Sequence, residues 1–324
     1  MTLDRDAIEL HRAAVVPRVD RTRLPSGPTT RFAPAPTGYL HLGHVANAIY
    51  VWGATRATGG RVVLRIEDHD RQRCRPGFEV ALLDDLDWLG LTPDLGTTAE
   101  LRAGSSALRQ SDSGPAYSAA LERLSAAGLV YACDCSRTTF TAWSREHGSS
   151  WSGPGCPGDC RAHGLTPGHG VGLRVALGGG LEAFDDLLMG PLSGDPSRGG
   201  DLLVRDRHGN WTYPFAVVVD DEREGVDLVI RGGDLVDATP SQLRLGRLLG
   251  RTVPPAYLHH PLVLRPDGAK LSKADGDTGI RDLRVDGWTP EAVFGAAAAA
   301  VGLIDRARPV GAEELPSLVV TVSG

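Results

Sequence analysis

The feature that most constrains the fold is a Pro- and Gly-rich turn between a short predicted strand and a helix-forming segment. Residues 30–33 predict a strand, ProAlaProThrGly follows as the turn, and residues 42–58 predict a helix that GlyGly at 59–60 ends. A β-branched run at 61–66 then predicts a buried strand. This order favours an α/β fold with a parallel sheet, whose ligands bind at the carboxyl ends of the strands.

Similar patterns continue along the chain. Further helices are predicted over 77–89, 116–127, 239–250 and 289–303. The segment 171–236 is rich in β-forming runs, and we interpret PheAlaValValValAsp (215–220) as one of its strands. Residues 1–28 predict a flexible arm with one helical turn, and the last twenty residues predict a tail.

Two histidines and two lysines are the candidate catalytic residues. His41 and His44 lie three apart at a helix start, where free backbone N–H groups and the helix dipole favour an anion. Lys270 and Lys273 follow an AspGly turn and could neutralise a leaving pyrophosphate. A helix cap or a solvated surface would explain either pair alone. Together, the pairs indicate a site for a polyphosphate whose charge changes during reaction.

Composition excludes some classes of protein. Hydrophobic residues make up 41% and charged residues 23%, which is ordinary for a globular protein. No apolar run approaches the roughly 20 residues that span a membrane, and the first residues lack a signal-peptide pattern. We therefore expect a cytoplasmic protein with no membrane partner. The net charge of −6 argues mildly against a protein coated in nucleic acid.

Four of the five cysteines gather in a segment that is too poor in apolar residues to form its own core. They are Cys133, Cys135, Cys156 and Cys160. Four thiolates can hold a structural Zn²⁺ tetrahedrally and supply folding free energy, although the spacing alone leaves free thiols or disulfides open. Nearby histidines offer alternative ligands: His147, His163 and His169.

Two motifs resemble a known enzyme family. HisLeuGlyHis (41–44) and LysLeuSerLysAla (270–274) are similar to the HIGH and KMSKS signatures of class I aminoacyl-tRNA synthetases. The stretch from Arg31 to Gly43, with ArgIleGluAspHisAsp (65–70), resembles the glutamyl branch. The resemblance implies a ligase with a Rossmann-type parallel sheet.

Two later segments continue the resemblance, which covers about residues 29–304. They are TyrProPheAlaValValValAspAsp (213–221) and ValIleArgGlyGlyAspLeu (229–235). The resemblance implies that His41, His44 and Lys273 contact ATP. It also implies a pocket for glutamate, lined by Arg31, Phe32, Ala33, Pro34, Ala35, Glu67, Tyr213 and Arg231. An arginine can bind a carboxylate in bidentate fashion, and Glu67 can receive the ammonium group.

Only about fifty residues follow Lys273, which resembles a truncated branch of the family. That branch activates L-glutamate with ATP and Mg²⁺ without tRNA, then transfers it to the queuosine base at the wobble position of tRNA(Asp). The resemblance implies structural Zn²⁺, with Cys156 at a position where the branch often has tyrosine, and a monomer. Two alternatives stay open: a truncated enzyme that charges the acceptor end of tRNA(Glu), and a catalytically silent zinc-bearing tRNA-binding module.

These expectations divide the chain into five parts. They are a flexible arm (1–28), the first half of the catalytic domain (29–132), a zinc-binding insert (133–170), the second half (171–250), and a KMSKS-like loop with a short helical region (251–324). The last part includes no anticodon-binding domain in this prediction.

Overall fold

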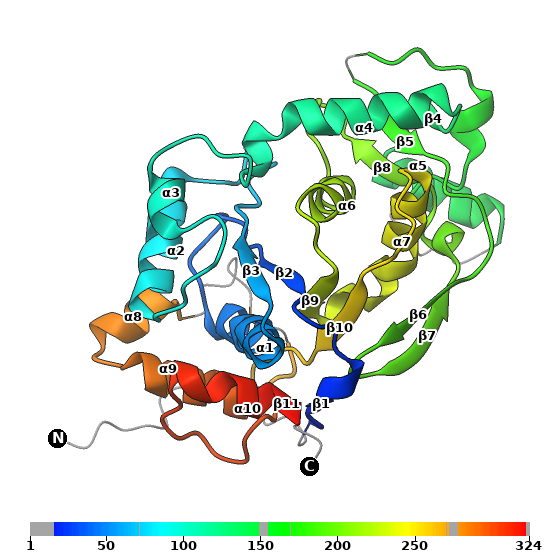
Figure 1. Cartoon of the computed structure of the whole chain (residues 1–324). Helices are drawn as coiled ribbons and strands as arrows, with labels where there is room; N and C mark the ends of the chain where they lie inside the picture. The colour runs from blue at the N-terminus through cyan, green and yellow to red at the C-terminus, as the bar shows by residue number, and fades with distance from the viewer. Residues whose placement is uncertain are drawn as a thin grey trace.

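The computed structural model describes residues 16–70, 72–148, 155–168, 170–269, 271 and 278–321. Parallel strands occupy its centre (Figure 1). β2 (Thr29–Phe32) pairs with β3 (Arg61–Leu64), and β9 (Leu228–Gly232) pairs with β10 (Ala256–His260). β2 adjoins β9, because the backbone N–H of Asp227 donates to the carbonyl of Thr29 at 3.0 Å. The predicted α/β fold with a parallel sheet is confirmed.

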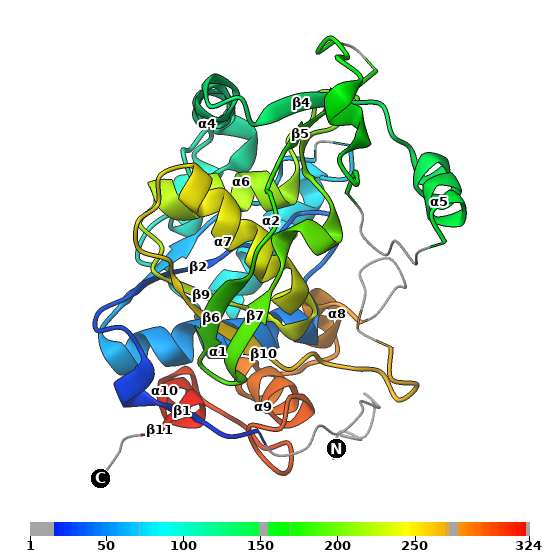
Figure 2. The ribbon, with the colours of Figure 1, turned by 90° about the vertical axis from the view of Figure 1, so that its right-hand side faces the viewer.

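A hairpin widens the second pair of strands. β6 (Glu182–Asp186) runs parallel to β10, and β7 (Gly190–Gly194) returns antiparallel to β6. In the view of Figure 2, β6 and β7 lie in front of the central strands, beside α7 (Thr239–Leu248).

Both faces of the central sheet are covered, and side chains that alternate along its strands pack on different helices. Ile230 belongs to the large apolar cluster that contains the side chains of α1 (Leu42–Thr58). Its neighbour Val229 packs instead with Leu243 of α7. Successive residues of a strand point to opposite faces, so α1 and α7 cover opposite sides of the sheet (Figure 1).

The helix predicted at 42–58 is confirmed at both ends by α1. Gly59 ends it with a left-handed φ of 71°, a conformation that glycine adopts without strain.

One predicted strand is wrong. Residues 215–220 lie in a helix, α6 (Tyr213–Arg223), which has Pro214 in its first turn. The β-branched run favoured a strand, but residues 215–219 are all buried, five in succession. Such a short apolar run fits a fully buried helix as well as a strand, and here packing outweighs β-propensity.

The chain ends are more ordered than the sequence predicts. The final twenty residues include α10 (Leu315–Val319) and β11 (Val320–Thr321), and β11 pairs in parallel with β1 (Val19–Asp20). α10 packs closely on α1 at Gly53, where an added Cβ would lie 2.6 Å from Val319. The predicted tail is therefore wrong, because its apolar residues cover α1. The arm is ordered where β1 pairs, and its first fifteen residues lie outside the described residues.

An antiparallel sheet stands beside the central one. β4 (Val130–Cys133) pairs with β5 (Gly172–Val175), and β5 pairs with β8 (Leu202–Arg205). This sheet carries the cysteine segment, at the upper right of Figure 1. Its strands come from both sides of the predicted insert 133–170, and the proposed division into domains stays a prediction.

The remaining helices surround these sheets. They are α2 (Pro76–Trp88), α3 (Thr98–Arg102), α4 (Gly114–Ala126), α5 (Arg137–Glu146), α8 (Ile280–Val285) and α9 (Pro290–Ala300). The predicted helices at 77–89, 116–127, 239–250 and 289–303 are confirmed, with small shifts at their ends. Within the described part of the chain, no helix combines the length and the apolar character that crossing a membrane needs.

Candidate active site

A cavity of about 340 Å³ opens at the carboxyl ends of the central strands, beside the start of α1. This is the edge where open α/β sheets bind ligands. Most of the residues predicted for the site line it: Arg31, Phe32, Ala33, Pro34, His41, His44, Glu67, Tyr213 and Arg231. Ala35 is not among the lining residues, and Lys270 and Lys273 lie outside the described residues.

The two histidines cap α1 and face the cavity. His41 is the N-cap, and its Nδ1 accepts the N–H of Gly43 at 3.1 Å, while its own N–H donates to Nδ1 of His44 at 3.1 Å. The two ring centroids lie 4.0 Å apart. Because each Nδ1 accepts a hydrogen bond, the proton of each neutral ring is on Nε2. The pair therefore adds two side-chain N–H donors to the helix N-terminus, which suits a phosphate.

Other residues on this side of the cavity are already hydrogen-bonded. The amide of Asn47 donates to Nε2 of His260 at 3.0 Å, and Nδ1 of His260 donates to the carbonyl of Pro261 at 2.8 Å. The ring of His260 stacks on Tyr50, and burial lowers its pKa to about 4. His260 is thus a neutral wall of the cavity. This role of His260 could not be predicted from the sequence, because HisHis at a strand end carries no signal for a nucleotide.

Arg31 is the better placed of two arginines for holding a carboxylate. Its Nε donates to Oδ1 of Asp221 at 3.1 Å, and its Nη1 donates to the carbonyl of Ile230 at 3.0 Å. A guanidinium has five N–H groups, so three of them remain for a ligand. The side chain is buried and held in place by these two bonds. Arg31 can therefore present a two-pronged donor to a carboxylate at little entropic cost.

Arg231 is held more tightly. Its Nε donates to Nε2 of His259 at 3.0 Å, and its Nη2 donates to Oγ1 of Thr239 at 2.8 Å. Its Nη1 donates to Oε1 of Gln242 at 2.5 Å, and its Nη2 also reaches the carbonyl of Leu235 at 3.3 Å. These four bonds leave one N–H group. Arg231 thus contributes its charge and a single donor to the cavity.

A buried carboxylate fixes the protonation of His259. Nδ1 of His259 lies 2.7 Å from Oδ2 of Asp186, and both side chains are fully buried. Burial alone would raise the pKa of Asp186, but hydrogen bonds from His259 and from backbone N–H groups hold this pKa below its usual range. Because Nε2 of His259 accepts from Arg231, Nδ1 carries the proton and donates to Asp186.

A second network supports Arg31 from below. Arg65 is fully buried, and its Nη2 donates at 2.6 Å to both Asp221 and Glu224. Burial raises the pKa of Asp221, but the charges of Arg31 and Arg65 outweigh burial and keep this pKa below its ordinary value. Asp221 therefore stays ionised between two arginines. This role of Asp221 was not predicted, because the β-branched run just before it favours a strand.

Glu67 is the one acidic candidate of the glutamate pocket that was predicted from the sequence. Burial raises its pKa to about 7, although the charges of Arg65 and Arg31 partly oppose that rise. Its carboxylate lies 4.0 Å from Nη1 of Arg65. An ammonium group bound beside Glu67 would favour the ionised form and lower this pKa.

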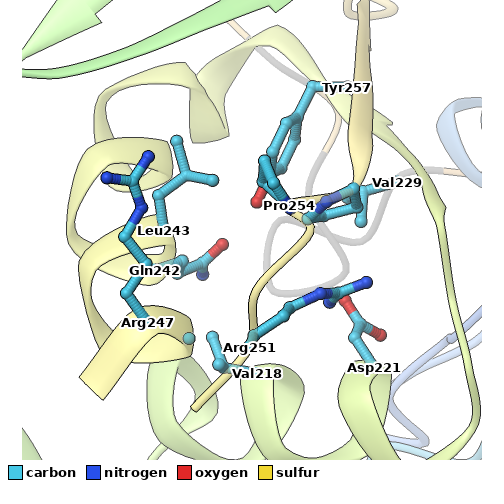
Figure 3. Close-up of a pocket in the computed structure, with 11 residues that line it drawn as sticks. Val218, Asp221, Val229, Gln242, Leu243, Arg247, Arg251, Pro254 and Tyr257 are labelled. Carbon is cyan, nitrogen blue, oxygen red and sulfur yellow. The ribbon is translucent and has the colours of Figure 1, made fainter. Parts of the chain in front are cut away.

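A smaller cavity of about 20 Å³ lies beside these networks. Figure 3 shows Gln242 and Tyr257 on its walls, with Asp221 on the opposite side. Nε2 of Gln242 is buried and has no hydrogen-bond partner among the described residues. The volume exceeds the ~10–15 Å³ that one water needs, so a water there would link side chains that hold both arginines.

The four cysteines predicted to bind zinc form a separate cluster. Their sulfur atoms all lie within 4.8 Å of one another, and Sγ of Cys135 lies 3.3 Å from Cys160 and 3.9 Å from Cys156. Tetrahedral zinc with bonds of about 2.3 Å separates its sulfur ligands by about 3.8 Å. Nε of Arg174 donates to Sγ of Cys133 at 3.1 Å, as a donor to a metal-bound thiolate would. The residues present therefore fit a structural zinc ion.

The alternative histidine ligands fit less well. His163 is exposed and forms a second group with Asp134 and Cys160. His147 stacks on Trp143 and is hydrogen-bonded to its carbonyl, whereas His169 lies outside the described residues. The four sulfur atoms thus form a group of possible ligands that includes none of the described histidines.

Comparisons with known proteins agree with this geometry. The sequence pattern of the tRNA synthetases class I (E and Q), catalytic domain, matches residues 29–301. The chain belongs to this family. It is therefore a ligase of the class I aminoacyl-tRNA synthetase type.

Two curated relatives and one solved structure show which members of the family the chain is similar to. A glutamyl-Q tRNA(Asp) synthetase of Symbiobacterium thermophilum is 44% identical over 88% of this chain and 90% of the relative. Glutamate–tRNA ligase 1 of Acidithiobacillus ferrooxidans is 37% identical over 82% of this chain but only 55% of the relative. The crystal structure of a glutamate tRNA ligase from Elizabethkingia meningosepticum, in complex with its amino acid, has a TM-score of 0.72 at 25% identity. That similarity covers 90% of this chain and 64% of the ligase, under two thirds of its length.

Proposed function

We propose that the protein activates L-glutamate with ATP in the absence of tRNA and transfers it to the queuosine base of tRNA(Asp). The observation that carries this proposal is the pairing of Arg31 and Glu67 in one cavity with the histidine cap of α1. The cavity combines a guanidinium group that has three N–H donors left for a ligand, a carboxylate for an ammonium group, and an anion site. An acidic amino acid and a nucleotide phosphate match these three features.

The activation step needs positioning and charge stabilisation rather than a protein nucleophile. The α-carboxylate of glutamate attacks the α-phosphate of ATP, and pyrophosphate leaves. The Nε2–H groups of His41 and His44 are directed by their own hydrogen bonds to donate to the charge that develops on phosphate. Arg31, Arg231 and Glu67 would hold the amino acid in line for this attack.

The nucleotide enters the proposal as its Mg²⁺ complex. We assign Lys270 and Lys273 to the triphosphate, as the sequence motif implies, and both would neutralise the pyrophosphate as it leaves. Both substrates, ATP and tRNA, are found in the cytoplasm, and we propose that the protein acts there.

We propose Zn²⁺ as a structural ion held by the four cysteines of the cluster. When bound, it would supply folding free energy to a segment with few apolar side chains. Cys133 ends β4, Cys135 follows it by two residues, and the other two cysteines come from the segment 155–160. The ion would therefore join the antiparallel sheet to the loop that follows it.

The choice of queuosine as acceptor rests on the comparisons. The relative that is 44% identical is named for glutamyl-Q, and the alignment spans nine tenths of it. The glutamate–tRNA ligases match over little more than half of their length.

Two tRNA preparations test this choice. Zinc-replete protein with ATP and labelled glutamate should form an alkali-labile ester on tRNA(Asp) that carries queuosine, and none on tRNA(Asp) that lacks it. Labelling of tRNA(Glu) at its 3′ end, without labelling of the queuosine-bearing tRNA, would instead establish a truncated glutamyl-tRNA synthetase. Binding of tRNA with no turnover of ATP would identify a silent binding module.

A further inference from the structure

His69 stands beside Tyr213, a wall residue of the cavity, and the activation step does not use it. It follows Glu67 by two residues, just beyond the carboxyl end of β3, and it is partly exposed. Its ring centroid lies 6.4 Å from that of Tyr213, which lines the cavity. An imidazole therefore stands next to a residue that lines the proposed glutamate pocket.

A chain of buried hydrogen bonds orients the amide of Gln110 beside His69. Nε2 of Gln110 donates to Oδ2 of Asp220 at 2.9 Å, and a carboxylate of this kind accepts. Tyr117 also donates to Oδ2 at 2.7 Å, and Arg223 donates to Oδ1 at 3.0 Å, so Asp220 is held as an acceptor. The amide of Gln110 must consequently turn its oxygen toward His69.

This orientation of Gln110 determines the tautomer of His69. Oε1 of Gln110 lies 2.6 Å from Nδ1 of His69, so Nδ1 carries the proton and donates it. In the neutral ring, Nε2 then bears a lone pair. Gln110 and Asp220 are buried, and the backbone N–H of Gln110 donates to Ile66 at 3.1 Å, which fixes the amide in place.

The other histidines in and around the cavity have different roles. His41 and His44 accept at Nδ1 and thus present Nε2–H donors. His259 and His260 have both ring nitrogens engaged by neighbouring groups. Among the described residues, Gln110 is the one hydrogen-bond partner of the His69 ring. His69 is thus the histidine arranged to accept a proton from a ligand.

We infer that His69 is the general base of the transfer step, an inference that rests on the proposed function. The hydroxyl oxygen of the tRNA acceptor attacks the carbonyl carbon of glutamyl adenylate, and its proton passes to Nε2 of His69. The new ester bond forms as the carbon–oxygen bond to the phosphate breaks, and AMP leaves with that electron pair. Activation needs no such base, because the carboxylate that attacks ATP carries no proton.

The test compares the two half-reactions of the full-length, zinc-replete protein. Exchange of pyrophosphate with ATP in the presence of glutamate measures activation, and single-turnover transfer from preformed adenylate to tRNA measures the second step. In His69→Asn, the ratio of transfer rate to exchange rate should fall about 100-fold, the lower end of general-base contributions. A matched substitution of an exposed loop histidine, His208→Asn, should leave that ratio unchanged. A ratio within about three-fold of wild type in His69→Asn would overturn the inference.

Gln110→Met provides a second variant, which should affect the transfer step through His69. It removes the acceptor that fixes the tautomer, while Tyr117 and Arg223 still satisfy Asp220. Transfer should fall about ten-fold relative to exchange. A merely structural role for Gln110 would instead lower both rates together and would leave their ratio at the wild-type value.

Failure of the inference differs from failure of the proposed function. Wild-type protein that exchanges and transfers normally, together with an unaffected His69→Asn variant, removes only the role of His69. If the wild type charges the 3′ end of tRNA(Glu) instead, the same ratio is measured on that acceptor and decides the role there. Wild-type protein that transfers glutamate to neither tRNA overturns both.

Discussion

The substrate cavity and the cysteine cluster both join distant parts of the chain, but different forces hold them. Around the cavity, buried charges such as Arg65 and Asp221 pair with each other beneath a large apolar core. In the cluster, Cys133, Cys156 and Cys160 are buried with few apolar neighbours, among them Tyr131 and Phe140. We therefore expect the cavity to keep its shape without a ligand and the cluster to need the proposed metal ion for comparable order.

Arg31→Lys should have the largest effect on the cavity. A lysine cannot bond to Asp221 and to the carbonyl of Ile230 while also gripping a carboxylate in bidentate fashion. Loss of a partner from a buried ion pair costs about 3–5 kcal/mol, so kcat/KM for glutamate should fall by about 10²–10⁴. Steady-state exchange kinetics measure it, and the exposed Arg73→Lys serves as the unaffected control. An unchanged kcat/KM in Arg31→Lys would remove Arg31 from the binding site.

Cys135→Ser should lower the stability of the cysteine cluster rather than the affinity for glutamate. Loss of one of four thiolates should release the metal and lower the thermal unfolding midpoint by several degrees. Calorimetry measures the midpoint, and metal analysis measures the bound zinc. The matched variant Cys74→Ser, outside the cluster, should keep both values. Equal midpoints and an absence of zinc in wild type and Cys135→Ser would contradict a structural metal.

The pH dependence of glutamate binding should follow Glu67. Its pKa near 7 means that the ionised share rises from about a tenth at pH 6 to about nine tenths at pH 8. The ammonium of glutamate pairs with the ionised form, so KM for glutamate should fall about ten-fold over that interval. Glu67→Gln should flatten this profile and raise KM at pH 8. A wild-type KM that rises with pH would reverse the assigned sign.

Glu67 also affects folding. Its pKa is higher in the folded chain than its usual 4.5, so its contribution to stability is present at low pH and is lost as the pH rises through about 7. The Glu67→Gln variant should therefore be the more stable protein above pH 7, as denaturant unfolding at pH 5 and pH 8 would reveal.

Gln242→Met should give the smallest change in the cavity. The substitution removes one hydrogen bond to Arg231 and makes the small cavity of Figure 3 apolar. Since three other bonds still hold Arg231, KM for glutamate should rise about three-fold with kcat nearly constant. A fall in kcat at constant KM would mean that Gln242 acts on the reaction rather than on substrate binding.

Local signals predicted much of the fold. α1 could be placed at its residues because a turn precedes it and Gly59 stops it. α6 could not be predicted, because its short apolar run shows no alternation of apolar and polar residues that would distinguish a helix from a strand. α10 was missed because its contact with Gly53 joins chain segments more than 250 residues apart, and such pairing leaves no local trace.

The site divides in the same way. Arg31, His41 and Glu67 lie within motifs and could be predicted from them. Asp221 of α6 and His259 of β10 act through hydrogen bonds to arginines from other elements, which only the folded chain brings together.

The central claim is that this cavity activates glutamate on its own. Pyrophosphate exchange with ATP, Mg²⁺ and L-glutamate in the strict absence of tRNA tests it most directly. We predict rapid exchange with glutamate and at least 100-fold slower exchange with glutamine, which lacks the second carboxylate. No exchange without tRNA in folded, zinc-replete protein, or equal exchange with both amino acids, would contradict the account.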